Sequence, residues 1–209
     1  MATRAILFDL DRTLVDVQSF SDYPGALARV EERIRTWQEP PTPPSGWDGP
    51  TQRAMGVLLA LWGDPRWAEI SAIIDEAEAA GVARSVAMPG LAAALRLSDG
   101  MPRAVVTLLT ASVAREVLGR HGIGIELVIG RRPDLAAKPA GDMLLAAAAQ
   151  LGVTPAQATM IGDSPWDQAG AAAAGCPFVG IDTDGRAEFA AGCPVVPTVA
   201  EAVRAALAR

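Results

Sequence analysis

The stretch Ile6-Leu7-Phe8-Asp9-Leu10-Asp11-Arg12-Thr13-Leu14 decides how this chain is organised. An apolar run typical of a buried strand ends in two aspartates, Asp9 and Asp11, that are separated by one residue. Carboxylates at the end of a buried strand need a partner, either a cation or a bound substrate. In an open α/β sheet, ligands bind outside the carboxyl ends of the strands, where these two side chains are expected to project. Other residues that converge on these two aspartates would complete such a site.

The composition is that of a globular chain with an acidic balance. Of its 209 residues 50% are hydrophobic, which suffices for a packed core, and the formal net charge is -6. Because there is no basic stripe, we expect neither a nucleic-acid partner nor a membrane partner. No apolar run is long enough to cross a bilayer and we see no signal peptide, so we expect a cytoplasmic protein. For the oligomeric state we leave monomer or homodimer open.

The alternation of strands and helices is interrupted after the first strand, residues 4–10, and later resumes. Between Val15 and Ala87 the pattern predicts helices only, with a proline-rich loop at residues 40–46. From Met88 onward it predicts strands at 103–107, 125–129, 158–162, 177–181 and 194–196, and helices at 90–97, 112–121, 140–151, 165–174 and 198–208. Short connections and apolar strands indicate an α/β fold, a Rossmann-like, mainly parallel sheet flanked by helices. Residues 1–14 and 88–209 would form its core domain, and residues 15–87 a small helical insertion.

More polar residues lie at the predicted ends of other strands. Thr107 ends one strand, and Gly162-Asp163-Ser164-Pro165-Trp166-Asp167 follows another. Lys138 is the single lysine of the chain and precedes a predicted helix, so its ammonium can reach the same edge. If the strands are adjacent, their carboxylates share one pocket and raise one another's pKa. Such an all-oxygen site selects a hard divalent cation, and Mg²⁺ fits best; with Lys138 and Thr107 added, it suits a phosphoryl group.

The set Asp9-Leu10-Asp11-Arg12-Thr13, Thr107, Lys138-Pro139 and Gly162–Asp167 resembles the four motifs of the haloacid dehalogenase superfamily. The likeness runs from residue 4 to about residue 181 and looks closest to the phosphoglycolate phosphatase-like and β-phosphoglucomutase-like branch. It implies a Mg²⁺-dependent phosphatase that hydrolyses a small phosphorylated metabolite through a phospho-aspartyl intermediate. It also implies that residues 15–87 are a cap domain that closes over the strand ends, with hinges near 14–17 and 86–89.

The resemblance also implies a role for each motif residue. Asp9 would be the nucleophile, and Asp11 would be first the general acid and then the general base. Mg²⁺ would be held by the Asp9 carboxylate, the Asp11 backbone carbonyl and Asp163. Thr107 and Lys138 would bind the phosphoryl oxygens, with Thr110 as the fallback for the hydroxyl. Asp167 would position Lys138 or a metal-bound water, and the other supporting residues would be Thr13 and Ser164.

Three residues outside these roles are candidates for substrate contacts. Arg12 stands where the family commonly has glycine, so the loop after Asp11 is either stiffer or carries an extra cation. Arg131 could reach a second anionic group of the substrate, or form a solvated pair with Arg132. Trp47 lies beside a loop of the insertion. Two other functions stay open: a sugar phosphomutase, in which Asp11 returns the phosphoryl group to another hydroxyl, and a catalytically idle binding or partner module.

Overall fold

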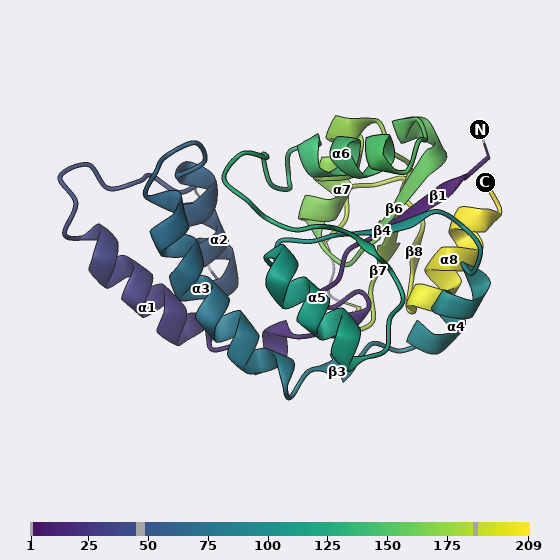
Figure 1. The fold of residues 1–209 in the computed structure, drawn as a ribbon. Helices are drawn as coiled ribbons and strands as arrows, with labels where there is room; N and C mark the ends of the chain where they lie inside the picture. Colours follow the sequence, from purple (N-terminus) through teal and green to yellow (C-terminus); the bar gives the residue numbers. More distant parts are fainter. Residues whose placement is uncertain (1, 45–48, 186–187) are drawn as a thin grey trace.

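In a computed structural model, which describes residues 2–44, 49–185 and 188–209, an α/β body carries a helical insertion at one side (Figure 1). The body is built on a six-stranded sheet with the order β5-β4-β1-β6-β7-β8. All neighbouring strands in it are parallel. The strands are β1 (Ala5–Phe8), β4 (Arg103–Val106), β5 (Leu127–Ile129), β6 (Ala158–Gly162), β7 (Phe178–Ile181) and β8 (Val195–Val196). The predicted fold class is confirmed.

Strand β1 lies inside the sheet and places the two aspartates at its carboxyl edge. All of its side chains are buried. Phe8 is in register with Val105 of β4 on one side and with Ile161 of β6 on the other. Because these strands are parallel, the residues that follow them meet at the same edge of the sheet.

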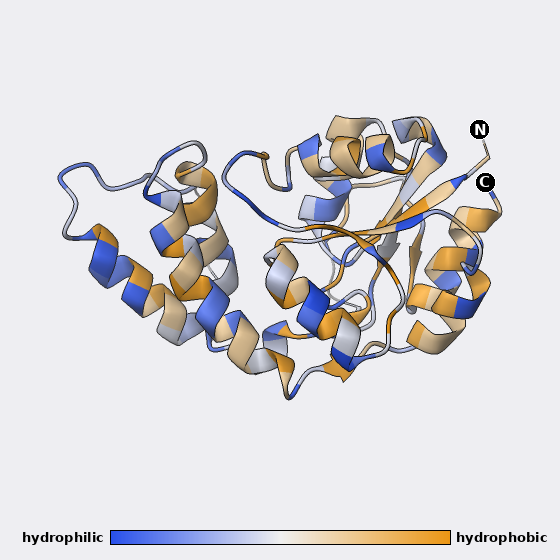
Figure 2. Cartoon of the chain, in the orientation of Figure 1, coloured by the Kyte–Doolittle hydropathy of each residue, from blue (hydrophilic) through white to orange (hydrophobic). Residues whose placement is uncertain are grey.

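Helices cover both faces of the sheet. One face carries α4 (Leu91–Leu97), α5 (Ala111–Arg120) and α8 (Val199–Leu207), and the other carries α6 (Asp142–Gln150) and α7 (Pro165–Ala174). The side chains of β1 alternate between these two apolar layers, Ile6 and Phe8 entering the first, Ala5 and Leu7 the second. Most strand residues are therefore apolar, and orange segments on the strands in Figure 2 mark them. This is why the sequence predicted a sheet covered on both sides.

The insertion has an apolar cluster of its own. The insertion consists of the short helix η1 (Gln18–Phe20) followed by α1 (Tyr23–Ile34), α2 (Pro50–Ala60) and α3 (Trp67–Val82), and the cluster lies between these three α-helices. A second short helix, η2 (Pro155–Gln157), belongs to the body and precedes β6. Asp22 caps α1 by accepting a hydrogen bond from the Gly25 amide. Two residues of the body, Leu108 and Trp166, pack against this cluster, so the insertion rests on the body next to the sheet edge.

The two ends of the insertion pair with each other. β2 (Val15–Asp16) and β3 (Val86–Ala87) form an antiparallel ribbon. The expectation of no strand between Val15 and Ala87 was wrong at both ends, because two-residue strands are too short to leave an alternating pattern in the sequence. The ribbon coincides with the predicted hinges, and we propose it as the boundary between the two predicted domains.

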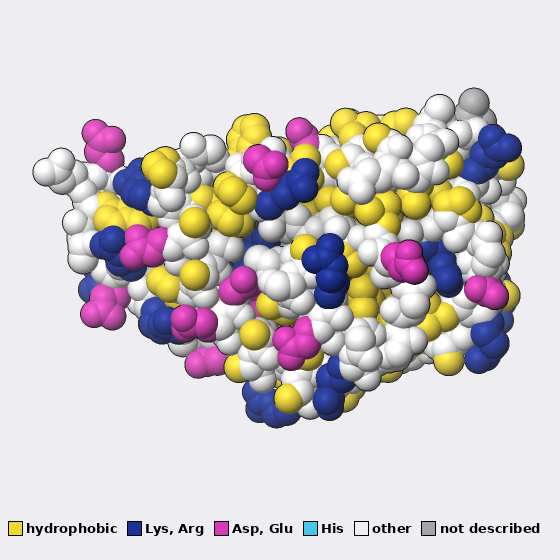
Figure 3. Space-filling model, viewed as in Figure 1, with side chains coloured by type: hydrophobic (Ala, Val, Ile, Leu, Met, Phe, Trp, Pro, Cys, Tyr) yellow, Lys and Arg dark blue, Asp and Glu magenta, His cyan; other side chains and the backbone are white. Residues whose placement is uncertain are grey.

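Charges of both signs are mixed on the face of the molecule shown in Figure 3. Asp and Glu side chains are interspersed there with Arg side chains over the insertion and the body. In the described part of the chain, no helix combines the length and the apolar character that crossing a bilayer requires.

Candidate active site

A cavity of about 650 Å³ lies where the carboxyl edge of the sheet faces the insertion. The body contributes residues that the sequence singled out, among them Asp9, Asp11, Arg12, Thr107, Lys138 and Asp163. The insertion contributes residues that the sequence did not single out, among them Gln18, Tyr23, Thr51, Gln52 and Met55. The parallel sheet therefore brings four separate segments of the body together, and the insertion forms the opposite wall.

Lys138 is the buried centre of the polar residues. Its side chain is 1% exposed, and Nζ donates hydrogen bonds to Asp9 Oδ1 at 2.7 Å, Asp167 Oδ1 at 2.5 Å and the Val106 carbonyl at 2.8 Å. Burial alone would lower the pKa of this ammonium, but the carboxylates of Asp167 and Asp9 outweigh burial and raise it above its ordinary value. Lys138 is therefore a fixed positive charge beside Asp9.

Asp167 is held in place by the first turn of α7. Its Oδ2 accepts hydrogen bonds from the Ser164 amide at 3.1 Å and the Ser164 hydroxyl at 2.6 Å, and its amide donates to the Ser164 hydroxyl at 3.2 Å. A Cβ at Gly162 would lie 2.5 Å from the Asp167 carboxyl group, so β6 must end in glycine for this carboxylate to approach. With both oxygens engaged, Asp167 orients Lys138.

The carboxylates of Asp9, Asp163 and Asp167 converge, with one oxygen of each within 4.8 Å of the others. Burial raises the pKa of Asp9 to about 6, although Lys138 opposes it. Burial, together with the nearby charge of Asp9, also raises the pKa of Asp163 well above its ordinary value. Since Asp167 is already engaged, Asp9 and Asp163 are the two carboxylates that could hold a cation, and a cation would relieve the cost of ionising them.

Asp11 is tied to the root of the insertion. Its Oδ1 accepts hydrogen bonds from the amides of Val17 at 2.9 Å and Gln18 at 3.0 Å, just past strand β2. Burial raises the pKa of Asp11 to about 7, and the two amide bonds only partly oppose that shift. A carboxyl group with this pKa can release and take up a proton near neutral pH.

Arg12 and Thr13 follow Asp11 in a tight turn. Arg12 has a left-handed backbone with φ of 60°, a conformation that favours glycine. Its side chain is 41% exposed at the cavity, with Nε 3.7 Å from Asp163 Oδ2 and Nη2 3.3 Å from Asp184 Oδ2. Thr13 is buried, and its hydroxyl has no hydrogen-bond partner in the part of the chain that the structure describes. Of the two alternatives for Arg12, a stiffer loop or an extra cation, its position beside Asp163 and Asp184 at the cavity favours the extra cation.

Thr107 and Thr110 point to different places. Thr107 is buried and lines the cavity, and its Oγ1 accepts a hydrogen bond from the Leu109 amide at 3.2 Å, so its own hydrogen can be donated. The Thr110 hydroxyl donates to Asp75 Oδ1 of the insertion at 2.7 Å and lies outside the cavity lining. The geometry therefore favours Thr107 for the phosphoryl contact.

Arg131 and Trp47 are not among the described residues that line the cavity. Trp47 lies outside the described residues. Arg131 does not line the cavity, and its side chain is 2% exposed because it forms a buried ion pair with Glu78 of α3. It is no solvated pair with Arg132 either, since Arg132 is half exposed and pairs with Asp134. We therefore correct the expectation that Arg131 reaches the substrate.

The chain is similar to known proteins both in sequence and in fold. A family model described as haloacid dehalogenase-like hydrolase matches residues 3–175. Phosphoglycolate phosphatases from Shigella boydii and Escherichia coli K12 are each 30% identical over 219 residues, covering 85% of this chain and 81% of theirs. CbbY from Rhodobacter sphaeroides in complex with phosphate aligns over 100% of both chains with a TM-score of 0.72 and 19% identity. A HAD family hydrolase from Deinococcus radiodurans with bound phosphate and sodium aligns over 99% of this chain and 96% of its own, with a TM-score of 0.60 and 24% identity.

Proposed function

Because the chain belongs to the haloacid dehalogenase-like hydrolase family and is a phosphatase of that family, we propose that it hydrolyses a small phosphorylated metabolite through an aspartyl-phosphate at Asp9. The observation that carries this proposal is the buried Lys138 ammonium, which donates hydrogen bonds to Asp9 and Asp167. Lys138 and Asp9 line the cavity together with Asp163. This arrangement supports the proposal because a carboxylate that could act as nucleophile, a fixed cation and a second carboxylate that could bind a metal line one cavity.

The residues divide the reaction into two steps. A carboxylate oxygen of Asp9 attacks phosphorus and the ester bond breaks, while Asp11 gives its proton to the departing oxygen. Water then attacks the aspartyl-phosphate, Asp11 takes up its proton, and phosphate leaves with the Asp9 carboxylate restored. Lys138 and the Thr107 hydroxyl would bind phosphoryl oxygens throughout. A pKa of about 7 suits Asp11 to both directions of proton transfer.

Mg²⁺ is the cation that fits the donor set best. Asp9 and Asp163 offer carboxylate oxygens only, and hard oxygen ligands select Mg²⁺ over softer transition metals. When bound, the ion would neutralise charge on the transferring phosphoryl group. Asp11 would contribute its backbone carbonyl, as the family resemblance implies.

The metal site leads to a prediction about stability. The pKa values of Asp9 and Asp11 rise from 3.8 to about 6 and about 7, so the metal-free fold binds protons more tightly than the unfolded chain. The contribution of these two groups to the free energy of unfolding is therefore most favourable below pH 4, and it decreases as the pH rises to about 7. At pH 7.5 and a hundred times its Kd, Mg²⁺ should raise the free energy of unfolding by about 2.7 kcal/mol, which corresponds to roughly 5 to 10 °C in Tm. The same Mg²⁺ concentration should raise Tm less at pH 5, because protons then compete for the carboxylates.

Thermal unfolding with Mg²⁺ or with chelator at the two pH values measures this effect. Asp163→Asn should abolish the shift, whereas Asp134→Asn, which changes an exposed acid paired with Arg132, should keep it. Equal Tm values with Mg²⁺ and with chelator at pH 7.5 would exclude a metal site at Asp163.

For the substrate we propose a small phosphorylated carboxylate, with phosphoglycolate as the first compound to test. Support comes from the relatives that bear this name at 30% identity. Arg12 also supports it, since this partly exposed guanidinium at the cavity could exchange Asp184 for a substrate carboxylate.

Release of inorganic phosphate from p-nitrophenyl phosphate and from a panel of phosphorylated metabolites tests the function. We expect turnover that requires Mg²⁺ and stops with chelator, and a higher kcat/KM for phosphoglycolate than for neutral sugar phosphates. Isomerised sugar phosphate in excess of free phosphate would instead identify a phosphomutase. Binding without turnover across the panel would identify an idle binding module.

A further inference from the structure

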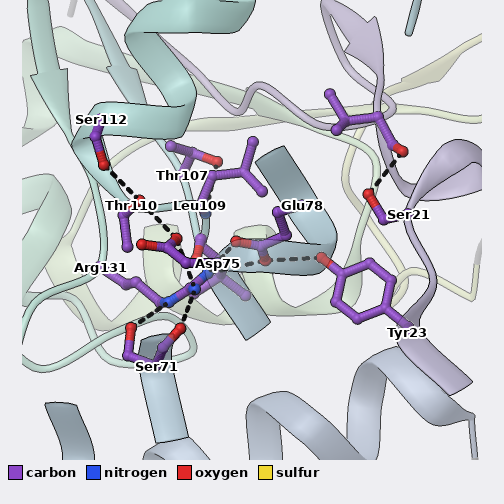
Figure 4. Close-up of polar contacts among 12 residues, drawn as sticks. Ser21, Tyr23, Ser71, Asp75, Glu78, Thr107, Leu109, Thr110, Ser112 and Arg131 are labelled. Atoms are coloured by element: carbon purple, nitrogen blue, oxygen red, sulfur yellow. Dashed lines mark hydrogen bonds and ion pairs between the residues drawn. The ribbon is translucent and has the colours of Figure 1, made fainter. Parts of the chain in front are cut away.

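Arg131 forms a buried polar network that crosses from the α/β body to the insertion (Figure 4). Its Nη1 donates to Glu78 Oε1 at 2.9 Å and to Glu78 Oε2 at 2.8 Å, and Nη2 lies 3.2 Å from Asp75 Oδ1. Its Nε donates to the Ser71 hydroxyl at 3.3 Å. Glu78 Oε1 also accepts a hydrogen bond from the Tyr23 hydroxyl at 2.9 Å. We call Arg131, Glu78, Asp75, Ser71 and Tyr23 the Arg131 network.

The body end of the network is the loop that follows Thr107. Arg131 Nη1 donates to the Leu108 carbonyl at 2.6 Å, and the Arg131 amide donates to the Leu109 carbonyl at 3.0 Å. A Cβ at Gly130 would lie 2.4 Å from the Ala111 amide nitrogen, so the two loops are in close contact. Arg131 is thereby fixed relative to Thr107, which lines the cavity.

The insertion end of the network is Tyr23 in the first turn of α1. Tyr23 is 4% exposed and lines the cavity that contains Asp9, and its hydroxyl is bonded to Glu78. Two walls of the cavity, Thr107 on the body and Tyr23 on the insertion, are thus linked through one guanidinium and one carboxylate.

The choice of a charged pair here is better explained by geometry than by stability. Glu78 is fully buried and Arg131 nearly so, and well-packed apolar residues usually stabilise such a site as well or better. A guanidinium, in contrast, fixes its partners in a plane with several directed hydrogen bonds. Burial raises the pKa of Glu78 and the charge of Arg131 opposes this, so Arg131 favours the ionised carboxylate that accepts from Tyr23.

We propose that Arg131 is a positioning residue, which acts through Glu78 to hold Tyr23 at the cavity wall and to hold the insertion at a fixed position relative to the Thr107 loop. The kinetic consequence rests on the proposed phosphatase function, but the structural consequence does not. The insertion is also joined to the body by the β2–β3 ribbon and by apolar packing. Further hydrogen bonds between them join Thr110 to Asp75, His121 to Ser85, and Asp11 to the first residues after β2. Among the described residues, none of these hydrogen bonds involves the Tyr23 hydroxyl.

The test compares the full chain with variants that change the network in steps. Arg131→Met alone would leave the Glu78 carboxylate buried without its cation, and such a variant can fail to fold. The double variant Arg131→Met/Glu78→Met removes both charges and avoids this cost. Tyr23→Phe removes only the hydroxyl that donates to Glu78. Arg132→Met is the matched control, because it removes the adjacent arginine, which is half exposed and pairs with Asp134.

Two measurements on these variants decide the matter. With p-nitrophenyl phosphate and saturating Mg²⁺, the double variant should raise KM about tenfold with kcat within about threefold, since a competent fraction near one in ten raises the apparent dissociation constant by that factor. Tyr23→Phe should shift KM in the same direction by less. Amide hydrogen exchange in residues 107–111 should become about tenfold faster in the double variant, while α6 keeps its wild-type rates. Arg132→Met should match wild type in both.

The outcomes separate the two proposals. Wild-type KM and wild-type exchange in the double variant, even with a changed Tm, would show that the network is structural only and would overturn the inference. If wild type itself shows no turnover with Mg²⁺, the proposed function fails, and the exchange rates in residues 107–111 alone support or overturn the positioning role.

Discussion

Asp9→Asn is expected to lower phosphate release by about 10⁴-fold or more while the fold stays intact. The amide cannot attack phosphorus, but it keeps the shape of the side chain and can still accept the hydrogen bond that Lys138 Nζ donates over 2.7 Å. The measurement is kcat with p-nitrophenyl phosphate at saturating Mg²⁺. Activity that survives this change would exclude an aspartyl-phosphate at Asp9.

The same variant should be more stable than wild type in the absence of metal. Because the pKa of Asp9 rises from 3.8 to about 6 on folding, ionising this group at pH 7.5 disfavours the fold, and the amide removes that penalty. The gain in free energy of unfolding should be at most about 3 kcal/mol, should disappear below pH 4, and should be reversed by Mg²⁺, which only wild type binds well. Asp134→Asn, at an exposed ion pair, should show neither the loss of turnover nor the gain in stability.

The body of the fold could be predicted because its signals are local and repeated. Strand β6 at 158–162 and helix α7 at 165–174 coincide with the predicted ranges, since an apolar strand followed by Ser164 and Pro165 marks both boundaries. The convergence of Asp9, Thr107 and Asp163 followed from parallel pairing alone. The strands β2 and β3 at the two ends of the insertion were missed because two residues per strand are too few to show an alternating pattern.

The direction of Arg131 could not be predicted, because it depends on a partner 53 positions away in the insertion. One signal was nevertheless present in the sequence. Glu78 continues the four-residue spacing of Ile70 and Ile74 on α3, so it occupies the helix face that is otherwise apolar and buried. A buried acid requires a cation, and a search for one would have led to the arginines of the body. Tyr23, which lines the cavity from the insertion, is a second hydrogen-bond donor to the Glu78 carboxylate.

The insertion also touches the proposed general acid. The Asp11 carboxylate accepts its two hydrogen bonds from the amides of Val17, which follows β2, and Gln18, the first residue of η1. Any rotation of the insertion about the β2–β3 ribbon would alter these bonds, which lower the pKa of Asp11. The Arg131 network and the hydrogen bonds of Asp11 therefore depend on the same position of the insertion relative to the body.

Lys138→Met is expected to weaken both the fold and the reaction. Removing the cation from a buried pair that includes Asp9 and Asp167 should cost about 3–5 kcal/mol in free energy of unfolding, and losing one charged contact to the phosphoryl group should lower kcat by about 10²- to 10³-fold. Because Lys138 lowers the pKa of Asp9, its removal should raise that pKa further. The destabilisation should accordingly be larger at pH 8, where Asp9 is ionised, than at pH 5, where it can bind a proton.

Denaturant unfolding at the two pH values and kcat at pH 7.5 measure these effects, and Lys138→Arg separates charge from shape. Arginine keeps the positive charge but presents a planar fork where the ammonium makes three bonds, to Asp9, Asp167 and the Val106 carbonyl. It should recover part of the stability and little of the turnover. Arg132→Met, which removes one positive charge from an exposed ion pair, should change neither quantity appreciably. Equal destabilisation of Lys138→Met at pH 5 and pH 8 would mean that the ammonium does not compensate the Asp9 carboxylate.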